Sequence, residues 1–312
     1  MYKFIFKIIL AATVLFIFIV AYGNFCDYFF TQKRFLDLSE KKQWVLSLEG
    51  GNYDYAVLGS SRAFGAFDMH LLDSLTGMKG INIASDGSGF KDNYLILSQF
   101  LKSNSINYLF LQIDEASLNS KESFSNEFHA FRFLPYWKDS LVQSTLKNEI
   151  PAYNTAFTEL LPEWRYFYFN KYFSPKEVLR RYVNSKNQRD EYSIYFGGKG
   201  ESFQSLLDSH ESKKIKLSKR IIDPKDWFYL ISLISLSNKQ KINMIAFVAP
   251  TYHGDQSFLK KSLGLLGVPV FFPDQFEDQD PKSFIDRGHL NSAGRSYFTP
   301  LFANFFNDSV TN

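Results

Sequence analysis

The pattern of apolar and polar positions separates one long apolar stretch at the N-terminus from a region where short apolar runs alternate with helix-length segments. These runs are continuously apolar, which is typical of strands covered on both faces of a parallel sheet. Helical periodicity precedes two of them, at about 92–101 and 227–239. The pattern therefore predicts an α/β fold around a parallel sheet of about five strands. The predicted strands lie at residues 55–58, 80–84, 107–113, 242–248 and 268–272.

The N-terminal stretch, residues 4–22, is interrupted only by Lys7 and Thr13. About 20 such residues are needed to cross a bilayer as a helix. Basic residues at its start predict a cytoplasmic N-terminus and an extracytoplasmic remainder. A cleavable signal peptide is the alternative, since Ala21-Tyr22-Gly23 fits a small-x-small cleavage site. We favour a single-pass anchor because the stretch exceeds the ~7 to 15 residues of a signal-peptide core. The predicted divisions are an anchor at 1–23, a juxtamembrane connector at 24–50 and an exported domain at 51–312.

Residues from about 120 to 220 interrupt the alternation and are rich in aromatic side chains. We expect a largely helical insertion that forms a cap over the active edge of the sheet. Its densest aromatic cluster, residues 164–173, also contains cations. That composition fits packing in a core, which we favour, or a segment resting on the bilayer surface.

Composition excludes some classes of partner and site. The chain has 35 basic and 32 acidic side chains, and this near balance disfavours a nucleic-acid partner. The single cysteine, Cys26, excludes an intrachain disulfide and a cysteine-based metal site. No other metal-ligand pattern stands out, so we expect neither a metal nor a cofactor.

Candidate chemistry lies at the exits of the predicted strands, where ligands of parallel sheets bind. Asp286 precedes His289 by three residues in a predicted turn, so its carboxylate can orient the imidazole and leave Nε2 free as a base. Ser61 follows the first strand in a glycine-led turn and is the candidate nucleophile. Either motif alone is weak, and together they indicate a Ser61/His289/Asp286 triad.

These residues resemble the SGNH/GDSL hydrolases, and more closely their membrane-anchored relatives linked to cell-envelope acylation. Residues 57–61, Val-Leu-Gly-Ser-Ser, resemble the first family block around the nucleophile, with Ser60 in the place of its usual aspartate. Residues 82–87 resemble the second block, so Gly87 and Ser61 would supply oxyanion-hole amides. Residues 286–291 match the last block. The resemblance implies a flavodoxin-like three-layer sandwich and covers roughly residues 52–118 and 225–307.

One family block departs from the pattern. Where the family has Gly-x-Asn-Asp, this chain reads Gln112-Ile113-Asp114-Glu115, so the third oxyanion donor is missing. Losing one such donor costs about 3 kcal/mol of transition-state stabilisation. Envelope-acylation relatives share this sort of loss, which favours acyl transfer or a slow, specific esterase over fast hydrolysis.

The resemblance implies an extracytoplasmic esterase or O-acyltransferase that acts on acyl esters of cell-envelope carbohydrate, with a membrane acyltransferase as a possible partner. A non-catalytic module that binds envelope polysaccharide or such a partner is the alternative. Arg62, beside the nucleophile, either steers an anionic substrate or pairs with Asp86 or another carboxylate. His253 follows a predicted strand end and is a candidate for lining the cleft.

Overall fold

The structure is a computed structural model. It describes residues 1–31, 41–118, 131–147, 152–169, 174–184, 222–252, 256–274, 281–286 and 288–311. The chain forms two compact units, which are described separately. One unit comprises residues 1–47 and 126–188, and the other comprises residues 48–125 and 189–312.

The second unit is built on a sheet of five parallel strands. The strands are β1 (Asn52–Leu58), β2 (Gly80–Asn82), β3 (Ser105–Gln112), β4 (Asn243–Phe247) and β5 (Val270–Phe271). Their order across the sheet is β2-β1-β3-β4-β5, and every neighbouring pair is parallel. The prediction of an α/β fold with about five parallel strands is therefore confirmed.

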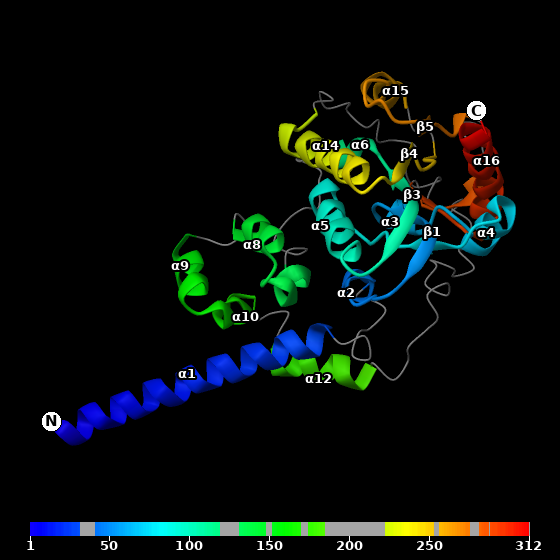
Figure 1. Cartoon of the computed structure of the whole chain (residues 1–312). Helices are drawn as coiled ribbons and strands as arrows, with labels where there is room; N and C mark the ends of the chain where they lie inside the picture. Colours follow the sequence, from blue (N-terminus) through cyan, green and yellow to red (C-terminus); the bar gives the residue numbers. More distant parts are fainter. Residues whose placement is uncertain are drawn as a thin grey trace, which may run out of the picture. The chain divides into compact units, whose positions relative to one another are not determined.

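Helices lie on both sides of this sheet (Figure 1). On one side are α5 (Phe90–Phe100) and α14 (Pro224–Lys239), and on the other are α4 (Met69–Thr76) and α16 (Ser292–Thr311). Shorter helices of this unit are α3 (Ser61–Phe64), α6 (Glu115–Leu118) and α15 (Ser257–Leu263). The helices predicted at about 92–101 and 227–239 correspond to α5 and α14.

Phenylalanines form much of the core between the sheet and α16. Phe110 of β3 lies 4.9 Å from Phe302, between ring centroids, and Phe271 of β5 lies 5.7 Å from Phe298. All four rings are nearly or fully buried. Burying such large apolar side chains is a main source of fold stability, and it fixes the strands whose ends carry the candidate site.

A small antiparallel pair follows the sheet near the C-terminus. It consists of β6 (Phe284–Asp286) and β7 (His289–Leu290), preceded by the short 3-10 helix η7 (Pro281–Ser283). Asn291 then caps α16, since its side-chain oxygen accepts a hydrogen bond of 3.0 Å from the Gly294 amide. The sequence pattern did not predict this pair of strands. Its place is fixed by hydrogen bonds such as that of 3.0 Å from the Asn291 amide to the Ser283 carbonyl.

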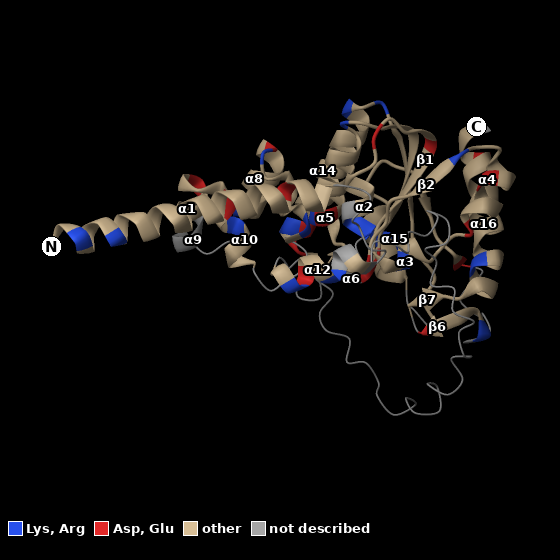
Figure 2. Cartoon of the chain, turned by 90° about the horizontal axis from the view of Figure 1, so that it is seen from below, with Lys and Arg blue, Asp and Glu red and all other residues tan. Residues whose placement is uncertain are grey.

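The first unit begins with the apolar helix α1 (Tyr2–Thr31), which continues past the apolar stretch without a break. Its length and composition are sufficient to span a membrane. Figure 2 shows basic residues near the N-terminal end of α1 and a long uncharged stretch beyond them. The short helix α2 (Lys41–Leu46) also belongs to this unit.

The described part of the insertion is helical, as expected. It contains η3 (Phe131–Tyr136), α8 (Ser140–Lys147), α9 (Ala152–Leu160), η4 (Pro162–Trp164), α10 (Arg165–Tyr168) and α12 (Pro175–Asn184). Within the cluster 164–173, Tyr166 and Phe169 are buried, whereas Trp164 and Phe167 are half-buried. The described part of the cluster, residues 164–169, thus packs in a core only in part, and residues 170–173 lie outside the described residues. That the insertion forms a cap stays a prediction.

Candidate active site

The turn after β1 presents Ser61 at the start of α3. Gly59 is required there by close packing, because a Cβ at this position would lie 2.7 Å from the Cβ atoms of Ala63 and Gln112. Ser60 is the N-cap residue of α3, and its hydroxyl accepts a 3.3 Å hydrogen bond from the Arg62 amide. The turn therefore holds the half-buried Ser61 at the carboxyl end of a buried strand.

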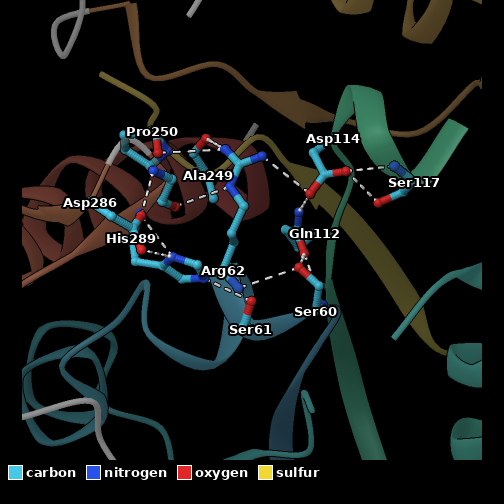
Figure 3. Close-up of polar contacts among 11 residues, drawn as sticks. Ser60, Ser61, Arg62, Gln112, Asp114, Ser117, Ala249, Pro250, Asp286 and His289 are labelled. Carbon is cyan, nitrogen blue, oxygen red and sulfur yellow. Dashed lines mark hydrogen bonds and ion pairs between the residues drawn. The ribbon is translucent and has the colours of Figure 1, made fainter. Parts of the chain in front are cut away.

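The structure brings Ser61, His289 and Asp286 together (Figure 3). The Ser61 Oγ lies 2.8 Å from the His289 Nε2, although the two residues are 228 positions apart. The His289 Nδ1 lies 2.9 Å from each oxygen of the Asp286 carboxylate. A carboxylate only accepts hydrogen bonds, so Nδ1 carries the proton and Nε2 accepts from the serine hydroxyl. This is the arrangement that activates a serine nucleophile.

The turn between β6 and β7 orients the carboxylate. One oxygen of Asp286 accepts hydrogen bonds from the amides of Gly288, at 2.8 Å, and His289, at 3.0 Å. The hydrogen bond from the His289 side chain lowers the pKa of the Asp286 carboxyl below its ordinary value; partial burial opposes this shift, and both amides contribute to it. Asp286 is therefore ionised at neutral pH and can stabilise a protonated imidazole.

A buried polar network lies beneath the Ser61 turn. The Gln112 side-chain oxygen accepts hydrogen bonds of 2.9 Å from both the amide and the hydroxyl of Ser60. The Gln112 side-chain nitrogen donates to the Asp114 carboxylate at 2.6 Å. Gln112 is 1% exposed, so these contacts link the Ser61 turn to Asp114 within the interior of the unit.

Arg62 connects this network to the His289 turn. Its guanidinium forms an ion pair with Asp114 at 3.2 Å and donates to the Gly288 carbonyl at 3.2 Å. It also donates to the carbonyls of Ala249 and Pro250. Of the two alternatives for Arg62, pairing with a carboxylate is thus observed, and the partner is Asp114. These contacts indicate that Arg62 fixes the turn that carries Ser61 relative to the turn that carries His289.

The charge of Asp114 depends on its partners. Burial alone would raise the pKa of this carboxyl, but the Arg62 guanidinium and the hydrogen bonds from Ser117 and Gln112 more than offset burial and lower it. The Ser117 amide and hydroxyl donate to one carboxylate oxygen at 2.7 Å and 2.5 Å. The sequence did not identify Asp114 as the partner of Arg62.

Of the remaining predicted site residues, the structure describes Gly87 but not His253. Gly87 is in the loop after β2 and has a left-handed φ of +63°, which favours glycine. Asn82 orders the start of this loop, because its side chain donates to the Phe64 carbonyl at 3.2 Å and accepts from the Ala84 amide at 3.1 Å. His253 lies outside the described residues.

The described part of the chain contains no group of three or more His, Cys, Asp or Glu side chains that could hold a metal ion. Comparison with models of known protein families gave no match, and comparison with curated proteins gave none. The assignment of a function therefore depends on the motifs and on the geometry of the site.

The ion pair between Arg62 and Asp114 gives the first testable prediction. Asp114→Asn leaves a mostly buried guanidinium without its countercharge, which we expect to lower the free energy of unfolding by about 3 kcal/mol. The pKa of Asp114 is lower in the folded chain than in the unfolded chain. The carboxylate therefore stabilises the fold above its unfolded pKa, and this stabilisation is lost as pH falls through its folded pKa. Wild-type stability should thus fall more than that of the variant as pH falls below about 4, the pKa of an aspartate in the unfolded chain.

Chemical denaturation of the full chain in detergent measures both effects. Asp274→Asn is the matched control, because Asp274 forms an exposed ion pair with Lys260 at 2.7 Å in the same unit. We expect that control to cost less than about 1 kcal/mol. Equal losses for the two variants would contradict a structural role for the Arg62–Asp114 pair.

Proposed function

We propose that the chain is a membrane-anchored, extracytoplasmic serine esterase or O-acyltransferase of the SGNH/GDSL type, acting on acyl esters of cell-envelope carbohydrate. The observation that carries the proposal is the continuous hydrogen-bonded series from Ser61 through His289 to Asp286. Further support comes from the strand order β2-β1-β3-β4-β5, which is the order of flavodoxin-like sheets. Such sheets bind ligands beyond the carboxyl ends of their strands, where Ser61 lies.

The reaction would proceed by two acyl transfers. His289 Nε2 takes the proton of Ser61 as the Oγ attacks the ester carbonyl, and Asp286 stabilises the imidazolium that forms. The amides of Ser61 and Gly87 would stabilise the developing oxyanion. The imidazolium then protonates the leaving alcohol, and an acyl-serine remains. Water or a sugar hydroxyl, deprotonated by His289, attacks this ester and releases Ser61.

The missing asparagine favours a slow or transfer-type reaction. With two amides in place of three donors, the oxyanion is stabilised by about 3 kcal/mol less than in a complete site. Hydrolysis of simple esters would therefore be slow. A bound sugar acceptor can compensate, because positioning the attacking hydroxyl lowers the barrier of the second step.

The membrane part of the proposal depends on α1. Lys3 and Lys7 precede the apolar stretch, so the N-terminus would remain cytoplasmic and the sheet-containing unit would lie outside the cytoplasm. That location would bring the serine to envelope carbohydrate and to a membrane acyltransferase partner. The length of the apolar stretch, which exceeds the ~7 to 15 residues of a signal-peptide core, supports an uncleaved anchor over a signal peptide.

Release of p-nitrophenol from p-nitrophenyl acetate tests the proposed function. The full chain in detergent is expected to release it slowly, and an envelope polysaccharide acceptor is expected to accelerate release if acyl transfer is the reaction. Equal rates with and without acceptor would indicate a hydrolase. Release that is no faster than that of Ser61→Ala would contradict both.

A non-catalytic binding module is the second candidate. The observation that favours it is Asp114, which stands where the family has its asparagine: its carboxylate cannot donate to an oxyanion and is paired with Arg62 at 3.2 Å. In that case the chain would bind envelope polysaccharide or a membrane acyltransferase without reacting. Binding of the polysaccharide by wild type and Ser61→Ala with no ester turnover by either would support this candidate.

A further inference from the structure

The insertion and the anchor helix share a row of aromatic side chains within the first unit. Phe167 of α10 lies 6.4 Å from Phe18 and 5.9 Å from Tyr22, both in α1. Trp164 stacks on Phe167 at 5.7 Å, and Phe157 of α9 lies 5.7 Å from Trp164. We call Phe18, Tyr22, Phe167, Trp164 and Phe157 the aromatic row. It leads from the membrane-spanning helix to the surface of the insertion.

The position of Phe18 along α1 sets the depth of this row. Residues 4–22 form a helix about 28 Å long, which matches a hydrocarbon core of about 30 Å. Phe18 is four residues before the end of that stretch, or about 6 Å inside its outer boundary. A ring that contacts both Phe18 and Tyr22, as Phe167 does, therefore lies near that boundary.

A buried polar cluster fixes α10 against the anchor helix. The Arg165 guanidinium forms an ion pair with Asp27 of α1, and the Tyr166 hydroxyl donates to the same carboxylate. Arg165 is 2% exposed, and it also donates to the Leu134 carbonyl at 3.0 Å. Asp27 is five residues beyond Tyr22, about 7 Å outside the hydrocarbon. The charges thus lie on the aqueous side of α10, and Phe167 lies on the membrane side.

Exposed apolar side chains continue the aromatic row. Phe157 is 57% exposed and Leu160 is 85% exposed, both in the last turn of α9. Leaving such side chains in water is unfavourable, whereas the boundary between lipid headgroups and acyl chains suits apolar and aromatic groups.

Gly23 permits α1 and η4 to approach each other closely, because a Cβ at Gly23 would lie 2.4 Å from the Glu163 Cβ in η4.

We propose that residues 157–168 rest in the outer bilayer interface, with phospholipid covering Phe157, Leu160 and the exposed edge of the aromatic row. This inference depends on the proposed membrane anchor but is independent of the proposed enzymatic activity. The insertion would then be held at the membrane surface by its own side chains as well as by α1. The interfacial alternative for the aromatic cluster accounts for its half-buried members better than core packing does.

Quenching of tryptophan fluorescence by brominated lipids tests this placement. The full chain, with Trp164 as its single tryptophan after Trp44→Phe, Trp137→Phe and Trp227→Phe, is reconstituted into phosphatidylcholine vesicles. Bromine is placed either near the headgroups or near the acyl-chain ends. We expect Trp164 to be quenched more strongly by bromine near the headgroups. Strongest quenching from the chain ends, or none at either depth, would overturn the proposal.

A second variant separates this inference from the anchor itself. When Trp164 is also replaced by Phe, Phe16→Trp places a single tryptophan inside the apolar stretch of α1, where the chain-end bromines should quench most. If Phe16→Trp is quenched and Trp164 is not, the anchor stands and the interfacial placement fails. If neither is quenched, the anchor fails and the interfacial placement fails with it.

A label at Leu160 provides an independent measurement if the tryptophan variants fold poorly. Leu160→Cys carrying an environment-sensitive fluorophore should shift its emission to the blue on reconstitution into vesicles. Cys26 is fully buried, so the unsubstituted chain is the control for labelling at that thiol. Emission at the wavelength of the same probe in buffer would contradict lipid contact.

Discussion

Ser61→Ala is expected to lower kcat for ester turnover by at least about 10³-fold, the largest effect of any single substitution in the chain. The hydroxyl 2.8 Å from the His289 Nε2 is the proposed acceptor of the acyl group, and alanine offers no alternative nucleophile. Steady-state kinetics with p-nitrophenyl acetate measure the loss. The oxyanion amides and substrate contacts remain in this variant, so KM should change little.

Ser296→Ala is the matched control for this variant. Ser296 lies on α16 in the same unit, is exposed, and its hydroxyl donates to the Ser292 carbonyl at 3.0 Å. We expect turnover by Ser296→Ala to equal that of wild type. Equal activity of Ser61→Ala and wild type would exclude Ser61 as the nucleophile.

Asp286→Asn is expected to lower kcat by about 10²- to 10⁴-fold. The asparagine keeps the shape of the side chain but removes the charge that stabilises the imidazolium. Its amide group can also bind Nδ1 in the wrong tautomer, which would place the proton on Nε2, where the base must be free. The Asp286 side chain is 48% exposed, so in the variant water would stabilise part of the imidazolium charge. We therefore expect a loss near the lower end of this range.

Circular dichroism of the purified variant distinguishes this effect from misfolding, because Asp286→Asn should retain the wild-type spectrum. Asp274→Asn, which removes an exposed carboxylate paired with Lys260 and not with His289, should retain full turnover. A full wild-type kcat for Asp286→Asn would show that the carboxylate does not act on His289 during the reaction.

Much of the parallel sheet could be predicted because its strands are buried on both faces and therefore appear as continuous apolar runs. The bounds of the two edge strands, β2 and β5, were predicted less accurately. The strand predicted at 80–84 ends at Asn82, whose side chain turns back onto the Ala84 amide. The strand predicted at 268–272 contains only Val270–Phe271 in regular pairing. A hydrogen bond such as that between the Asn82 side chain and the Ala84 amide, which ends a strand, leaves no periodic signal in the sequence.

The pair β6–β7 was missed for a related reason. Its strands have three and two residues, too few to show an alternation. The proximity of Ser61 and His289 was nevertheless expected, because Ser61 follows a predicted strand and the Asp-x-x-His turn was predicted to orient a base toward it.

The side-chain contacts that position the Ser61 turn could not be predicted from the sequence. The contacts of Gln112 with Ser60 and of Arg62 with Asp114 each join positions 52 residues apart. A buried glutamine or aspartate is visible in a sequence only as a polar residue after an apolar run. Its partner follows from the register of β1 against β3, which places Leu58 beside Leu111. Sequence reasoning therefore predicted that Ser61, His289 and Asp286 lie together but not which residues position them.

The most direct measurement of the central claim is peptide mass spectrometry of the full chain after reaction with a fluorophosphonate. Such probes phosphonylate only a serine that a neighbouring base has activated. We predict one adduct, on the peptide that contains Ser61, and its absence in His289→Ala, which retains the serine but lacks the base. An intact, folded wild-type chain with no adduct on Ser61 would contradict the account.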